Sequence, residues 1–145
     1  MHFDEPHALP LISRGQQRAA RRLLSRKGRE EDGLFLAEGT QAVREALRRP
    51  ELVEAVIVSN PAEHSELLAM ADPRICWLAH PSDIDQLTDT VTPQGIVAIC
   101  RSELASLNDL PAPKLAVVCA QVRDPGNAGT VIRCADAFGA DAVIL

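Results

Sequence analysis

Residues 114–145 read KLAVVCAQVRDPGNAGTVIRCADAFGADAVIL, and their pattern predicts the fold of this part of the chain. The run 114–122 is apolar almost throughout, which is typical of a parallel strand buried on both faces. After a Pro-Gly turn, Asn127 is a good helix N-cap and Gly139 a good helix stop. The apolar run 141–145 predicts a second strand. The order strand, helix, strand predicts a right-handed parallel crossover.

The helix expected between Asn127 and Phe138 has two unlike arcs when residues are placed 100° apart. The apolar arc, which we expect to contact the sheet, holds Ala128, Val131, Cys134, Ala135 and Phe138. The other arc holds Gly129, Thr130, Arg133 and Asp136. Arg133 therefore projects away from the sheet, and Gly129, one turn earlier, leaves space beside it.

Three interpretations of this stretch remain open. The first is an ordinary crossover in which Arg133 pairs with Asp136 on the surface. The second is a nucleotide-binding loop, although the chain has neither GxxxxGK(S/T) nor GxGxxG followed by an acid about 20 residues later. The third is half of an RNA phosphate and ribose site, made by a glycine-lined helix start and an outward arginine.

The chain before residue 114 alternates between short apolar runs and amphipathic segments. This alternation predicts an α/β layer fold over residues 13–101. The expected strands are 34–39, 54–59, 75–79 and 95–100, and the expected helices are 16–27, 40–49, 62–71 and 82–89. Gly28, Thr40 and Ser82 are the expected stop of the first helix and caps of the second and fourth. Residues 1–12 are expected to form a flexible tail, residues 102–113 a linker, and residues 114–145 the start of a second domain.

The net charge of −5 hides a strong asymmetry. Residues 14–49 carry ten basic and five acidic residues, a local charge of +5 that leaves −10 for the remainder. In the expected helix 16–27, Arg18, Arg21 and Arg22 share one face, opposite Ala20, Leu23 and Leu24. The face is flanked by Arg14 and Arg29. It is either a solvated helix surface or an RNA-binding surface, since arginine can form paired hydrogen bonds with phosphate.

Several function classes are disfavoured by composition. No apolar run approaches the ~20 residues of a membrane span, and the acidic, proline-containing N-terminus is not a signal peptide. A cytoplasmic protein without membrane contact is therefore expected. The four cysteines form no CxxC pair and the four histidines form no cluster, so we expect buried thiols and no metal site.

The terminal stretch resembles the first motif of the SpoU (TrmH-type) RNA ribose 2′-O-methyltransferases of the SPOUT superfamily. That motif is Asn-x-Gly-x-x-x-Arg, followed five residues later by Phe-Gly. The matching positions here are Asn127, Gly129, Arg133, Phe138 and Gly139. The earlier segments FLAEGTQAVREAL and TPQGIVAI are similar to parts of the substrate-binding domain found in many members, so the resemblance covers about residues 13–145.

The resemblance implies a small α/β substrate-binding domain of ribosomal-protein type, followed by the first βαβ part of a knotted methyltransferase domain. It implies S-adenosylmethionine as cofactor, RNA (ribosomal RNA in particular) as partner, and a homodimer formed through the knot. Asn127 and Arg133 match site residues of the family motif. The expected RNA contacts are Arg14, Arg18, Arg21, Arg22, Arg29, Gly129 and Thr130.

The second and third family motifs, which supply the cofactor loops and the knot, have no match in the chain. We therefore expect residues 1–145 to be an N-terminal portion of the enzyme that is inactive alone and does not bind the cofactor. Two alternatives remain: a non-catalytic RNA-binding module, which a longer reading frame with further loop motifs would disfavour, and a small-nucleotide-binding domain, which nucleotide binding without RNA would support.

Overall fold

The computed structural model describes residues 8–145 and divides the chain into two compact units, Met1–Glu103 and Leu104–Leu145. Each unit has its own sheet, so the strands at 95–100 and 114–122 are not neighbours in one sheet. Within residues 8–145, no helix combines the length and the apolar character that a membrane crossing requires.

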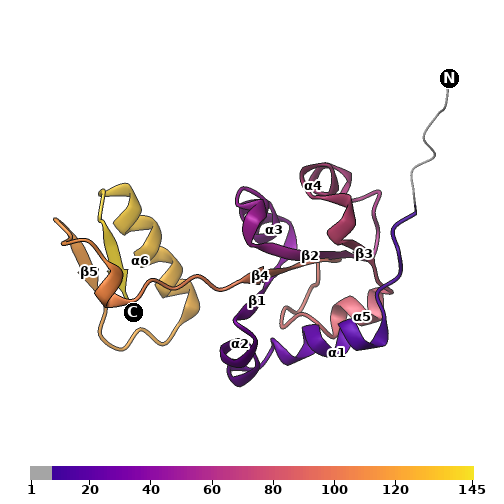
Figure 1. The fold of residues 1–145 in the computed structure, drawn as a ribbon, viewed down its shortest axis with the longest axis horizontal. Coiled ribbons are helices and arrows are strands. Elements are labelled where there is room, and N and C mark those ends of the chain that lie inside the picture. Colours follow the sequence, from indigo (N-terminus) through magenta and orange to yellow (C-terminus); the bar gives the residue numbers. More distant parts are fainter. Residues whose placement is uncertain (1–7) are drawn as a thin grey trace. The chain divides into compact units, whose positions relative to one another are not determined.

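The first unit is built on a mixed sheet of four strands in the order β1-β4-β2-β3 (Figure 1). The last strand, β4, runs antiparallel to both β1 and β2, whereas β2 and β3 are parallel. All four strands lie where the apolar runs predict them. Their bounds are Leu34–Glu38 for β1, Val53–Val58 for β2, Cys76–Leu78 for β3 and Ile96–Arg101 for β4.

Helices cover both faces of this sheet, so the unit has three layers (Figure 1). Two apolar clusters lie between the layers: one contains residues of α3 and α4, and the other contains residues of α1 and α5. Alternation along β2 places Val56 and Val58 in the first cluster and Ile57 in the second, and all three are fully buried. The helix bounds are Arg14–Arg22 (α1), Arg26–Asp32 (α2), Gly39–Leu47 (α3), Ser65–Met70 (α4) and Pro81–Asp85 (α5). Short 3-10 turns lie at Pro50–Leu52 and Pro73–Ile75.

The predicted single helix at 16–27 is wrong, because the chain breaks it into α1 and α2. Ser25 has extended backbone and accepts a hydrogen bond from the amide of Gly28, which starts a new helix. Gly28 is thus inside α2 and does not end a helix; Gly33, with φ of +64°, ends α2. On the apolar face expected opposite the arginines, Ala20 and Leu23 are 0% and 2% exposed, and Leu24 is half-buried.

The predicted caps Thr40 and Ser82 are also wrong. The Thr40 amide and hydroxyl both donate to Oε1 of Gln94, 54 residues away, and the cap position belongs to Glu38. At α5 the cap position is His80, and Pro81 opens the helix. Proline suits a first helical position because its missing amide hydrogen would have no partner there.

The predicted flexible tail at 1–12 does not hold for its last residues. Residues 1–7 lie outside the described residues. Farther along, Ile12 donates its amide to Leu78 of β3, and Leu78 donates to Pro10. Ile12 is 5% exposed and belongs to the cluster under α1 and α5, so this segment is part of the fold.

The second unit contains two parallel strands, β5 (Ala116–Val118) and β6 (Ala142–Ile144), joined by α6 (Pro125–Ala137). A 3-10 turn at Leu107–Asp109 precedes them. The predicted strand, helix, strand order is confirmed, and Gly139, with φ of +72°, follows the helix end at Phe138. The predicted apolar arc holds for Ala135, which is buried, but not for Cys134 or Phe138, which are exposed.

Candidate nucleic-acid interface

The basic face of α1 is held in place from the helix start. Ser13 and Gln16 form a reciprocal capping box: the Gln16 amide donates to Oγ of Ser13, and the Ser13 amide donates to Oε1 of Gln16. Ala20 anchors the opposite side of the helix in the core. The outward face forms a shallow hollow lined by Arg14, Gln17, Arg18, Arg21 and Arg22.

Three of these arginines have no carboxylate partner among residues 8–145. Arg14, Arg18 and Arg21 are exposed and make no ion pair with any residue between 8 and 145. We refer to Arg14, Arg18 and Arg21 as the α1 arginine row. Their guanidinium groups are therefore available to an external anion.

Arg22 and Arg29 are engaged within the fold instead. The Arg22 guanidinium lies 2.9 Å from Glu31 and 3.2 Å from Asp32, and the hydrogen bond to Asp32 above all raises its pKa. Arg29 donates to the carbonyls of Leu23 and Leu24 at 2.9 and 3.0 Å and satisfies groups at the end of α1. Arg22 and Arg29, which we expected to contact RNA, thus stabilise the α1–α2 junction.

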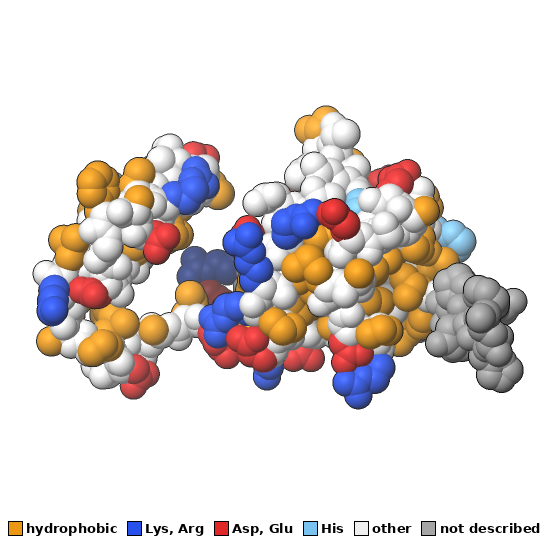
Figure 2. Space-filling view, turned by 90° about the horizontal axis from the view of Figure 1, so that it is seen from above, with side chains coloured by type: hydrophobic (Ala, Val, Ile, Leu, Met, Phe, Trp, Pro, Cys, Tyr) orange, Lys and Arg blue, Asp and Glu red, His pale blue; other side chains and the backbone are white. Residues whose placement is uncertain are grey.

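Elsewhere on the first unit, basic side chains lie beside acidic ones. Figure 2 shows Lys and Arg next to Asp and Glu on the face it presents. Arg44 pairs with Glu66 at 2.9 Å, and Arg48 pairs with Glu45 at 3.0 Å. Such pairs offer a polyanion less local positive charge than the α1 arginine row does.

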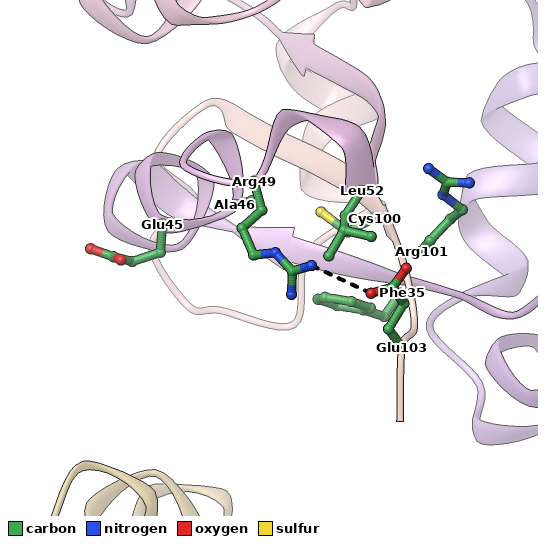
Figure 3. Close-up of a pocket in the computed structure, with 8 residues that line it drawn as sticks. All are labelled: Phe35, Glu45, Ala46, Arg49, Leu52, Cys100, Arg101 and Glu103. Carbon is green, nitrogen blue, oxygen red and sulfur yellow. Dashed lines mark ion pairs between the residues drawn. The ribbon is translucent and has the colours of Figure 1, made fainter. Parts of the chain in front are cut away.

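A second hollow, drawn in Figure 3, has an apolar floor that includes Phe35, Leu52 and Cys100. Its rim carries two arginines, both paired. Arg49 extends toward Glu103 at 3.5 Å and also contacts Glu51 at 3.0 Å, while Arg101 lies 3.2 Å from Glu54. Because carboxylates neutralise both guanidinium groups, this hollow is a poorer phosphate site than the α1 arginine row.

In the second unit, the start of α6 departs from the prediction. The N-cap is Asp124, whose Oδ2 accepts from the Asn127 amide at 2.8 Å, so Asn127 is not the cap. The Pro-Gly pair that we expected to form a turn is the beginning of the helix. The Asn127 side chain makes no hydrogen bond with any residue between 8 and 145, which leaves its amide available to a ligand.

Arg133 lies along the surface of α6 toward the helix start. Its Nη2 donates to Oγ1 of Thr130 at 3.2 Å, and a Cβ added at Gly129 would lie 3.5 Å from its Nη1. The Thr130 hydroxyl in turn donates to the carbonyl of Gly126 at 3.0 Å. The expected surface pair of Arg133 with Asp136 does not form among the described residues. The structure thus brings Gly129, Thr130 and Arg133 together.

The cysteines are split between core and surface. Cys76 and Cys100 are buried as predicted, whereas Cys119 is half-buried and Cys134 is exposed. Burial raises the pKa of the Cys100 thiol to about 11. Within the described part of the chain, no three His, Cys, Asp or Glu side chains are grouped to hold a metal ion.

Comparison with protein families decides the affiliation of the first unit. Residues 16–98 match the MRM3-like substrate binding domain. The chain belongs to this family. The matched range begins in α1 and ends in β4, so it includes nearly the whole four-stranded sheet and its covering helices.

Relatives of this MRM3-like chain extend across both units and are SpoU/TrmH-type rRNA 2′-O-methyltransferases. One is the 23S rRNA (guanosine(2553)-2′-O)-methyltransferase RlmP of Bacillus subtilis, 36% identical over 125 residues, which are 86% of this chain and 48% of the relative. Another is the mitochondrial rRNA methyltransferase 3A of Danio rerio, 33% identical over 129 residues, 83% of this chain and 29% of the relative. The chain thus spans about half the length of the bacterial relative.

Solved structures show the same fold as this MRM3-like chain. The AdoMet-bound rRNA methyltransferase from Sinorhizobium meliloti superposes with a TM-score of 0.71 at 28% identity, covering 93% of this chain and 52% of that one. The SpoU methyltransferase AviRb from Streptomyces viridochromogenes shares the fold, with a TM-score of 0.69 at 24% identity. The likeness to the Sinorhizobium meliloti structure covers 93% of this chain, and the predicted α/β fold class is confirmed.

Sequence patterns missed two features that shape these surfaces. The first is the break between α1 and α2, for which Ser25 three residues before Gly28 was the available signal. The second is Asp124, whose position directly before Pro125 marks a helix start. Both signals are local. The continuous helical pattern over 16–27 hid the first, and the Pro-Gly pair followed by Asn127 hid the second.

Proposed function

We propose that the whole protein transfers a methyl group to a ribose 2′-hydroxyl of ribosomal RNA. The observation that carries this proposal is that its rRNA methyltransferase relatives align with both units of the chain. In this proposal, residues 13–101 bind the RNA, residues 102–113 are a linker, and residues 114–145 begin the methyltransferase domain. A cytoplasmic homodimer is the proposed working form.

The α1 arginine row is proposed to contact RNA phosphates, while α6 contributes to the reaction site. A ribose hydroxyl is a weak nucleophile unless its proton is accepted or the developing charge is stabilised. Arg133 is a poor proton acceptor because guanidinium stays protonated in proteins. We propose instead that Arg133 holds the phosphate beside the hydroxyl and stabilises negative charge on the 2′-oxygen, while the Asn127 amide orients the ribose.

S-adenosylmethionine would supply the methyl group when bound. Ligand sites of this kind enclose most of the ligand. Of residues 104–145, Ala135 alone is buried, so these residues do not enclose a complete cofactor site. We therefore propose that cofactor binding needs residues outside 1–145, and that residues 1–145 alone are inactive.

The test is single-turnover methylation of ribosomal RNA by the whole protein, with cofactor affinity measured in parallel. We expect Arg133→Ala to slow methyl transfer by a factor on the order of 10²–10³, as the loss of one transition-state donor does. Arg133→Lys should not restore the rate, because an ammonium cannot form the paired hydrogen bonds. Cofactor affinity should stay unchanged.

Asp136→Asn serves as the matched control, because Asp136 lies one turn from Arg133 on the same helix and makes no ion pair with it among the described residues. Its rate should be close to that of the unaltered protein. Near-normal turnover in Arg133→Ala would show that Arg133 is not part of the reaction site. RNA binding without any methyl transfer would instead identify a binding module.

A further inference from the structure

The shape and chemistry of the α1 surface indicate which form of RNA it can bind. We propose that the α1 arginine row binds the sugar-phosphate backbone of a base-paired RNA stem and does not read unpaired bases. This inference rests on the proposed function, in which the same helix contacts RNA. It adds the class of RNA structure that the helix recognises.

The first argument is geometric. Arg14, Arg18 and Arg21 follow one another at intervals of four and three residues, so they rise along one helix face by about 6 Å and then about 4.5 Å. Such a row follows a line, and the backbone of a stem presents its phosphates along a line. Each guanidinium can donate two parallel hydrogen bonds to one phosphate.

The second argument is that acidic side chains confine the positive charge to this row. On one side, the Gln17 amide donates to Oδ2 of Asp83 on α5 at 3.1 Å. On the other side, Glu31 and Asp32 neutralise Arg22. The exposed cations therefore form a narrow strip that can contact one backbone of a stem. The acidic flanks would repel any phosphate backbone laid across them.

The third argument is the lack of a surface on which bases could stack. Proteins that bind unpaired RNA stack bases on aromatic side chains, whereas stems are recognised by shape, phosphates and 2′-hydroxyls. Among the described residues, no aromatic side chain lines the α1 hollow. Phe35 lines two other hollows, one of them beside the end of α1 at Leu23, and Trp77 packs against the core cluster under α1 and α5. The row thus offers charge and hydrogen-bond donors only.

The experiment measures binding of the chain to two RNAs with equal numbers of phosphates, a short hairpin stem and an unstructured single strand. We expect tighter binding to the stem. Changing Arg14, Arg18 and Arg21 together to Gln should weaken stem binding on the order of ten-fold at low salt and make the slope of log affinity against log salt less negative by about 2.7. Binding to the single strand should change much less.

The matched control removes the same charge from ion-paired arginines by changing Arg44, Arg48 and Arg74 to Gln. It should keep the slope and the preference for the stem, because these groups are already neutralised by Glu66, Glu45 and Asp72. Circular dichroism should confirm that both variants fold, since Arg44 is half-buried and the other altered side chains are exposed. Arg18→Glu alone is a second, smaller test of the same row.

Two results would overturn the inference. Equal or tighter binding to the single strand, or an unchanged slope in the α1 variant, would contradict stem recognition while leaving RNA binding and methylation intact. Absence of binding to either RNA would contradict the RNA contact in the proposed function as well. Methyl transfer by the whole protein is measured separately, so its outcome does not depend on the stem preference.

Discussion

The thiols of Cys76 and Cys100 lie in the apolar cluster beneath α3 and α4, and their environment controls their chemistry. Burial raises the pKa of both, and in Cys76 the charge of Asp72 contributes as well. The thiolate is the reactive form, so a raised pKa together with burial suppresses reaction. Cys134, in contrast, is exposed on α6.

We therefore expect a graded reaction with a thiol reagent at about pH 8, near the ordinary pKa of a free cysteine. Cys134 should react first and Cys119 more slowly, while Cys76 and Cys100 should react only after unfolding. Mass spectrometry of timed samples measures the order, and Cys134→Ser should abolish the fast phase. Labelling of Cys100 in the folded chain at the rate of Cys134 would contradict the buried position.

At the scale of elements, the junction of α1 and α2 depends on a glycine. Gly28 is buried inside α2, and a Cβ added there would overlap the carbonyl oxygen of Arg22 and lie 2.7 Å from its carbonyl carbon. Backbone atoms cannot move aside as a flexible side chain can. Close contact between the end of α1 and α2 therefore requires the absence of a side chain at this position.

Gly28→Ala should destabilise the first unit by roughly 1–3 kcal/mol, because the added methyl forces the two helices apart. Gly15→Ala is the matched control in α1, where the nearest atom to an added Cβ is 3.9 Å away. That change should be neutral or stabilise by up to about 1 kcal/mol, as alanine restricts the unfolded chain. Urea unfolding measures both, and equal effects at the two sites would contradict the clash.

The start of α6 allows a second test at this scale. Asp124→Ala removes the side chain that accepts from the Asn127 amide and should cost about 1 kcal/mol of local helix stability. Asn127→Ala should cost less, since its side chain makes no hydrogen bond within residues 8–145. Amide hydrogen exchange in the first turn of α6 reports the difference. Faster exchange in Asn127→Ala than in Asp124→Ala would contradict Asp124 as the N-cap and would favour Asn127.

At the scale of the whole molecule, the two units differ in how much apolar surface they bury. The first unit has a cluster on each face of its sheet. The second leaves large apolar side chains in solvent, among them Phe138 at 82% and Val118 at 70% exposed. Figure 2 shows hydrophobic side chains at the surface of this unit. Exposed apolar groups of this size commonly mark surfaces that another segment or chain covers.

We accordingly expect residues 1–145 to self-associate or to be poorly soluble, and residues 1–103 to remain monomeric. Sedimentation velocity over a range of concentrations compares the two chains. Calorimetry should detect no binding of S-adenosylmethionine to residues 1–145. Stoichiometric cofactor binding by a monomeric 1–145 chain would refute both expectations.

Local patterns in the sequence were sufficient for the order of elements. Period-two and continuous apolar runs predicted the four strands of the first sheet, because this signal arises from neighbouring residues. Glycine marked the end of the last helix at Gly139, whereas Gly28 lies inside a helix. The motif positions Gly129, Thr130 and Arg133 were likewise placed on one helix surface by helical period alone.

Features that depend on residues far apart in the sequence were set by the tertiary structure. It inserted β4 between β1 and β2, so that Arg101 pairs with Leu34, and it brought Gln94 to the start of α3. It also separated available arginines from occupied ones, since Arg22 finds Glu31 and Asp32 only after α2 folds back on α1. Sequence period sets which side of a helix a charge occupies, but the availability of that charge depends on which carboxylates the fold brings within a few ångströms.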